Sequence, residues 1–123
     1  YDSEPEADYV VEIGANDIWS YKKWHSGFAE CCGTLDVTTA IQTAFDGLAL
    51  YYNDESVESK KYPITFKATP CETASLQSAA GVAWLASNGK NSNSTSASYK
   101  IISTDKLTNS KYSITLDVKG YWR

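Results

Sequence analysis

The stretch that decides the fold is YSITLDV, residues 112–118. Tyr112, Ile114, Leu116 and Val118 would share one face of an extended chain, and the three polar residues between them would share the other. Side chains of a β-strand point alternately to its two faces. The pattern is therefore typical of an antiparallel strand with one buried face and one solvated face.

Shorter runs of the same kind occur along the rest of the chain, separated by segments rich in Gly, Asn, Asp and Ser. We expect an all-β protein with seven or eight short strands, arranged at this spacing as an antiparallel β-sandwich. The expected strands are 8–13, 17–24, 27–38, 62–66, 71–77, 81–86, 96–102 and 112–118. The expected turns are 14–17, 25–27, 52–56, 87–94 and 105–111.

One segment, residues 38–50, lacks a clear alternation. Ile41 and Phe45 are four positions apart, and Gly47 is suited to ending a helix. One or two helical turns and an irregular loop both fit this pattern. We therefore allow at most one short helix, placed here.

The composition limits the classes of function. A chain of 123 residues is the size of one domain. Its net charge of -4 argues against a nucleic-acid partner, because phosphate backbones are held by clustered Lys and Arg. No apolar window is long enough to span a bilayer, so membrane insertion is not expected. The acidic opening with Pro5 suggests that residues 1–7 are a linker from an upstream segment and that 8–123 is the domain.

The cysteines and the single histidine lie mostly within residues 17–39. Cys31, Cys32 and Cys71 are an odd number, and neighbours on a strand point to opposite faces. We expect no disulfide framework, and thiols that are mostly buried. His25 has no second histidine with which to complete a metal site, so we expect neither a metal nor a cofactor.

A catalytic interpretation of the same segment is weaker than a structural one. His25, Glu30 and Cys31 supply the residue types of a nucleophilic site. However, His25 falls in a turn, and Glu30 and Cys31 must point to opposite faces of a strand. Fifteen Asp and Glu residues offer many pairs for glycoside hydrolysis, but no spacing singles one out. We therefore expect a domain that is not an enzyme.

The aromatic residues of 17–24 must divide between two faces. In a strand, Trp19, Tyr21 and Lys23 share one face and Trp24 lies on the other. One set belongs to the core or to an interface. The other is left for solvent, subunit contact or carbohydrate stacking.

Residues 18–34, IWSYKKWHSGFAECCGT, resemble a motif of a known family. The family comprises the C-terminal domains of tail-associated minor structural proteins and of tail-fibre or receptor-binding proteins from phages and prophages of Gram-positive bacteria. Its motif reads approximately W-x-Y-x-K-W-x-x-G-x-A-E-x-W-G-T, and Cys32 replaces the last aromatic, the one between Glu and Gly. Residues 62–75 and 112–123 are similar to two further family segments. The matching positions in the first motif are Trp19, Tyr21, Lys23, Trp24, Gly27, Ala29, Glu30, Gly33 and Thr34.

The resemblance implies a β-sandwich in the virion, at the tip of a tail appendage assembled in the bacterial host cytoplasm. It also implies a homotrimer, a host cell-surface saccharide as ligand and an upstream tail segment as partner. A purely structural trimerisation or attachment domain is the first alternative, and a glycan depolymerase is the second. Within the motif, Lys23 and Glu30 are expected to form a cross-strand ion pair.

A saccharide site needs an aromatic face and neutral or anionic hydrogen-bonding side chains. Two loop-rich regions of the sequence combine these ingredients. We expect them to form a shallow groove, with neighbouring subunits as one way of bringing them together. The alternative is that Tyr51 and Trp84 belong to the core. The candidate residues are Tyr51, Tyr52, Asn53 and Asp54 in the first region, and Trp84, Asn88, Asn91 and Asn93 in the second.

Overall fold

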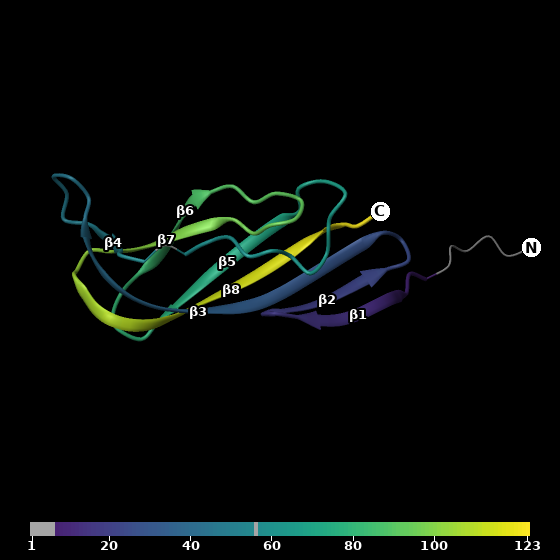
Figure 1. Ribbon diagram of the computed structural model, residues 1–123, viewed down its shortest axis with the longest axis horizontal. Coiled ribbons are helices and arrows are strands. Elements are labelled where there is room, and N and C mark those ends of the chain that lie inside the picture. The colour runs from purple at the N-terminus through teal and green to yellow at the C-terminus, as the bar shows by residue number, and fades with distance from the viewer. Residues whose placement is uncertain (1–6, 56) are drawn as a thin grey trace, which may run out of the picture.

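A computed structural model describes residues 7–55 and 57–123, so most of the expected linker lies outside the described residues. Eight strands pair with one another, all antiparallel (Figure 1). The predicted all-β antiparallel fold is confirmed. The strands are β1 (Val10–Asn16), β2 (Trp19–Trp24), β3 (Phe28–Ala44), β4 (Tyr51–Asn53), β5 (Cys71–Ser78), β6 (Trp84–Gly89), β7 (Ser98–Ser103) and β8 (Leu107–Tyr121).

All eight strands belong to one open hydrogen-bonded sheet that forms two layers. One layer has the order β1-β2-β3-β8-β5, and the other has the order β4-β7-β6. The long strand β3 belongs to both, because its first part pairs with β2 and β8 and its last part pairs with β4. Figure 1 shows the β1–β2 ribbon near one end of the elongated molecule and β4 near the other.

The core lies between the layers. Tyr112, Ile114, Leu116 and Val118 of β8 are all at most 2% exposed, as their alternation predicts. Ile101 of β7 joins the same apolar cluster from the other layer. Burying this apolar surface is the main force that holds the layers together.

The prediction of a strand at 62–66 is wrong, although every second side chain of this segment is buried as predicted. Tyr62, Ile64 and Phe66 are buried in the core, and none of them lies in a strand. Two backbone N–H groups of this segment donate to the loop before β7, one from Tyr62 and one from Phe66. The segment is therefore an extended strap across the core, held by a loop and not by a neighbouring strand.

The segment at 38–50 is neither of the two forms that the sequence left open. Residues 38–44 continue β3, and the chain then turns into β4 around Gly47, whose φ is 71°. The Phe45 N–H donates to the Leu50 carbonyl at 2.9 Å. The described residues contain no helix. The expected turn at 105–111 is also mostly strand, because β8 begins at Leu107.

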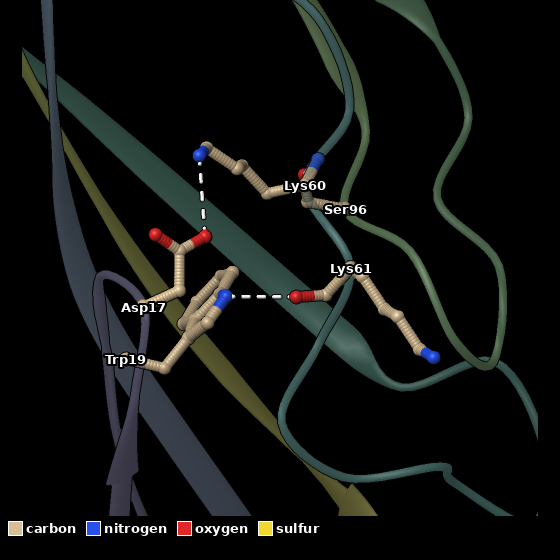
Figure 2. Close-up of polar contacts among 5 residues, drawn as sticks. All are labelled: Asp17, Trp19, Lys60, Lys61 and Ser96. Atoms are coloured by element: carbon tan, nitrogen blue, oxygen red, sulfur yellow. Dashed lines mark hydrogen bonds and ion pairs between the residues drawn. The ribbon is translucent and has the colours of Figure 1, made fainter.

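The turn between β1 and β2 is tied to the strap. The Trp19 indole N–H donates to the Lys61 carbonyl at 2.9 Å, and the Lys60 Nζ lies 3.2 Å from the Asp17 carboxylate (Figure 2). Lys60 and Ser96 exchange two further bonds, through the Lys60 N–H and the Ser96 N–H. Trp19 is only 2% exposed, so the family-like motif contributes a core residue with a satisfied donor.

Two expectations about the 17–39 segment need correction. Lys23 lies opposite Ala29, and its Nζ is 3.7 Å from Glu12, so the expected pair with Glu30 is not formed. The thiols are not mostly buried, because only Cys31 is buried and the other two free thiols, Cys32 and Cys71, are exposed. The ion pair fails because the register places Lys22 opposite Glu30. Cys32 is exposed because β3 turns alternate residues outward, and Cys71 is exposed at the start of β5.

Candidate functional site

The outer face of the β4-β7-β6 layer carries a line of large side chains in register. Tyr52 of β4 and Trp84 of β6 both lie opposite Ile102 of the central strand β7. Directly paired residues project from the same face of a sheet. Ile101 points into the core, so this line of three points away from it. We call Tyr52, Ile102 and Trp84 the aromatic platform.

The platform is apolar at its centre and accessible at one side. Ile102 is only 5% exposed between its two large neighbours, whereas Trp84 is 42% exposed. The Phe45 ring lies 5.0 Å from the Tyr52 ring, at an interplanar angle of 59°. The Lys100 Nζ lies 4.4 Å from the Tyr52 ring centroid, a cation–π distance. An exposed indole beside an apolar centre can stack on the apolar face of a sugar ring.

The sequence-predicted residues of the first region divide by role. Tyr51 points to the core side and packs against the core cluster. Asn53 is buried, and its amide is used within the chain: Oδ1 accepts the Ile101 N–H at 2.8 Å, and Nδ2 donates to the Glu55 carbonyl. Asp54 is exposed and accepts the Thr43 hydroxyl at 2.6 Å. Tyr52 and Asp54 are thus the outward-facing members.

The second predicted region divides in the same way. Trp84 and Asn88 are exposed on β6. The Asn91 amide donates to the Tyr62 hydroxyl at 3.1 Å and to the Pro70 carbonyl at 3.0 Å, so it joins two segments of the chain. Asn93 donates to the Phe66 carbonyl at 3.2 Å. The two asparagines in the loop therefore hold the strap, and Trp84 and Asn88 remain as surface groups.

The structure brings Tyr52 and Trp84 together within one chain, on either side of β7. Phe45, Lys100 and Ile102 are the members of this surface that sequence reasoning missed. The sequence shows the apolar and basic residues of 99–102, but it does not show their register with β4 and β6. That register depends on pairings between segments about 20 to 50 residues apart.

The catalytic constellation considered from the sequence does not assemble. Burial raises the pKa of the Cys31 thiol to about 12, so it is protonated at neutral pH. His25 is exposed and stacks on Tyr9, with ring centroids 4.8 Å apart. Among residues 7–55 and 57–123, no group of three or more His, Cys, Asp or Glu side chains is placed to hold a metal ion. No helix in the described part of the chain is long and apolar enough to cross a membrane.

Comparison with known proteins shows a likeness of fold. No family model and no curated protein matches the sequence. The structure is similar to an R1 pyocin fibre of P. aeruginosa comprising C-terminal residues 323–701, with a TM-score of 0.53 and 12% identity over 94% of this chain and 28% of that chain. It is also similar to an N-truncated R1-type pyocin tail fibre, with a TM-score of 0.53 and 10% identity over 94% of this chain and 87% of that chain. At this identity the likeness establishes the fold alone.

Proposed function

We propose that the chain is a domain of a tail fibre or related appendage of a phage or phage-like particle and serves in host recognition. The fold likeness to two pyocin tail-fibre fragments supports this proposal, and so does the motif in residues 18–34 that resembles Gram-positive phage tail proteins. The domain would then belong to the virion tail, assembled in the host cytoplasm and joined to an upstream segment. The role is one of binding and has no catalytic step.

The proposed ligand is a cell-surface saccharide, held on the aromatic platform. The observation that carries this proposal is the register that places Tyr52 and Trp84 on one outward face, with Trp84 42% exposed. An aromatic ring contacts the apolar face of a pyranose, while polar groups at the rim bond its hydroxyls. Asp54 and Asn88 are the exposed polar residues of the same region.

Adsorption to bacterial cell walls tests the saccharide proposal. Trp84→Ala and Tyr52→Ala, alone and together, should reduce adsorption to walls that bind the wild-type chain, and glycan-array signals should fall with them. Asp54→Ala should give a smaller loss. Lys111→Ala, which truncates an exposed side chain of the other layer outside both proposed surfaces, is the control. Full adsorption by the Trp84 and Tyr52 double variant, with unchanged melting, would show that the platform is not the site.

A structural role as a homotrimer subunit is the second candidate, and a different surface favours it. Within residues 7–55 and 57–123, five of the eight exposed large apolar side chains lie in or beside the β1 end of the first layer. Trp24 and Phe28 lie beside these side chains, with their ring centroids 5.3 Å apart. The Phe28 ring centroid is 6.0 Å from that of Tyr121. Exposed apolar side chains that gather on one surface can mark a contact between subunits. We call the five residues the β1 patch: Tyr9, Val10, Val11, Ile13 and Tyr121.

Light scattering at increasing concentration tests the assembly. The expected mass is three times 13.5 kDa, and Ile13→Lys should lower it, because a charge would then be buried in the contact. Ala15→Lys, at an exposed position two residues further along β1 and outside the β1 patch, is the control. A mass of one chain at all concentrations, in a sample that still adsorbs to cell walls, would favour recognition without trimerisation.

A further inference from the structure

A cavity lies on the other side of β6 from the platform. Trp84 belongs to the outer face, whereas Ser87 lines a cavity of about 390 Å³ that also touches β5 and β7. This volume is in the range of pockets that hold small ligands. We call this cavity the cleft. Its polar and aromatic lining is Glu72, Ser87, Lys90, Asn91 and Tyr99.

The cleft holds a rigidly fixed carboxylate. Oε1 of Glu72 accepts the Tyr62 hydroxyl at 2.5 Å, and Oε2 accepts the Tyr99 hydroxyl and the Ala97 N–H, the latter at 3.1 Å. The Asn91 amide in turn donates to the Tyr62 hydroxyl. The Tyr62 hydroxyl, the Tyr99 hydroxyl and the Ala97 N–H all point their hydrogens towards the carboxylate. All of them are also neutral, so the negative charge is held in place without being cancelled.

No ion pair of the described residues involves Glu72. Glu72 is half-buried, so its charge is screened less than that of a surface carboxylate. Lys90 lines the same cleft, but its side chain is exposed and it forms no ion pair within residues 7–55 and 57–123. The cleft thus contains a fixed anion, a tyrosine beside it and one unattached cation.

We propose that the cleft binds a small polar ligand that carries a primary ammonium group, and specifically a hexosamine with a free amino group. The ammonium would donate to Glu72 in a charge-assisted hydrogen bond, beside the Tyr99 ring. Lys90 lines the same cleft, and its positive charge would repel the ammonium group of the ligand. N-acetylation removes the positive charge and adds bulk, so the cleft discriminates against the acetylated sugar. The choice of a hexosamine rests on the proposed saccharide function, whereas the cleft itself is separate from the platform, because the two sites use opposite faces of β6.

Titration of the ¹⁵N-labelled domain with a chitosan oligosaccharide tests the proposal, with the N-acetylated chitin oligosaccharide as the matched ligand. The Ala97 amide is the reporter, because its N–H donates directly to Glu72. The expected result is a saturable Ala97 shift with chitosan, weakened by added salt, and none with chitin. Ethanolamine and D-alanine methyl ester supply the ammonium without the sugar and should bind more weakly.

Three variants separate the roles within the cleft. Glu72→Gln should weaken chitosan binding by about tenfold or more, the amount expected for a charge-assisted bond. Lys90→Gln should leave binding unchanged or tighten it, because a like charge beside the ammonium group is gone. Ser87→Phe should abolish binding by filling the cleft from an exposed position on β6, and it leaves the bonds of Glu72 intact, so it covers the case in which Glu72→Gln does not fold. All three variants keep Trp84, so adsorption to cell walls through the platform remains a separate readout.

The proposal is overturned if Ala97 shows no saturable shift, if chitin and chitosan act alike, or if Ser87→Phe binds as the wild-type chain does. Equal affinity for ethanolamine and chitosan overturns the assignment of a hexosamine. Loss of wall adsorption in the Trp84 variant with retained chitosan binding would uphold both sites independently.

Discussion

At the scale of single residues, the three thiols differ in their surroundings. Cys31 is 1% exposed, and burial is the largest cause that raises its pKa to about 12. Cys32 and Cys71 are exposed. The thiolate is the reactive form, and reaction also needs access. In the native domain at pH 8 we expect a thiol reagent to label two cysteines quickly and the third only after unfolding, as counted by mass spectrometry. Three labels at one rate would contradict this arrangement.

Trp19 is the residue through which the family-like motif reaches the core. Trp19→Phe removes the indole donor and leaves the Lys61 carbonyl without this partner, and it opens a small cavity. We expect a loss of about 1 to 3 kcal/mol in the free energy of unfolding, measured in urea. Trp84→Phe is the matched control on the exposed face, with an expected change within about 0.5 kcal/mol. Equal effects at both positions would show that the buried bond adds no stability.

Residue types alone could indicate the aromatic part of the candidate site but not the roles of its asparagines. Tyr52, Asp54 and Trp84 face outward as a saccharide surface requires. Asn53 and Asn91 have the same polar character, yet their amides bond Ile101, Tyr62 and Pro70. These partners are 20 to 50 residues away along the chain. Such pairing is set by tertiary structure, which local pattern does not specify.

At the scale of elements, alternation predicted which side chains are buried more reliably than it predicted strands. The pattern of 112–118 gave the buried face of β8 correctly, because a strand buried on one face must alternate. Residues 38–44 are strand because they pair with β8 and β4, even though Ile41 and Phe45 have helical spacing. Residues 62–66 alternate for the same reason as a strand does, since every second side chain enters the core. Their backbone, however, is bonded to a loop.

Two glycines at turns give a matched test of backbone conformation. Gly27 has a φ of 101°, and an added Cβ would lie 2.7 Å from the Arg123 carbonyl oxygen. Gly47 has a φ of 71° and open space around it. Gly47→Ala should cost about 1 kcal/mol from the left-handed conformation alone. Gly27→Ala should cost roughly 2 kcal/mol or more, because a backbone clash adds to the strain. Thermal unfolding of both variants measures the difference, and equal costs would rule out the contact with the last residue.

At the scale of the whole molecule, the open sheet leaves β5 and β6 without a hydrogen bond between them. The two edges are joined instead through side chains. Glu72 of β5 bonds Tyr99 of β7 and Tyr62 of the strap, so one carboxylate connects both layers and the segment that crosses the core. The protonation of Tyr62 and Tyr99, which donate to Glu72 at this junction, therefore affects the stability of the whole fold.

Burial, and then the hydrogen bond to Glu72, raise the pKa of Tyr62 and of Tyr99 well above the ordinary value of 10.0. A group whose pKa is higher in the folded state binds its proton more tightly there. Its contribution to stability is therefore complete below pH 10 and is lost as the pH rises above that value. The described structure thus predicts a domain that is stable to mild alkali up to about pH 10 and unfolds progressively beyond it.

Urea unfolding between pH 8 and pH 12 measures this dependence. Each of the two tyrosines should steepen the fall of the unfolding free energy by up to about 1.4 kcal/mol per pH unit above pH 10. Tyr99→Phe loses its hydrogen bond to Glu72 and so starts less stable at pH 8, but its slope above pH 10 should be shallower by one tyrosine. Lysine deprotonation in the same range is common to both proteins and cancels in the comparison. If the unfolding free energies of the wild-type chain and Tyr99→Phe fell in parallel with pH, the protonated Tyr99 phenol would not hold the junction. The apolar core would then account for the contact between the layers.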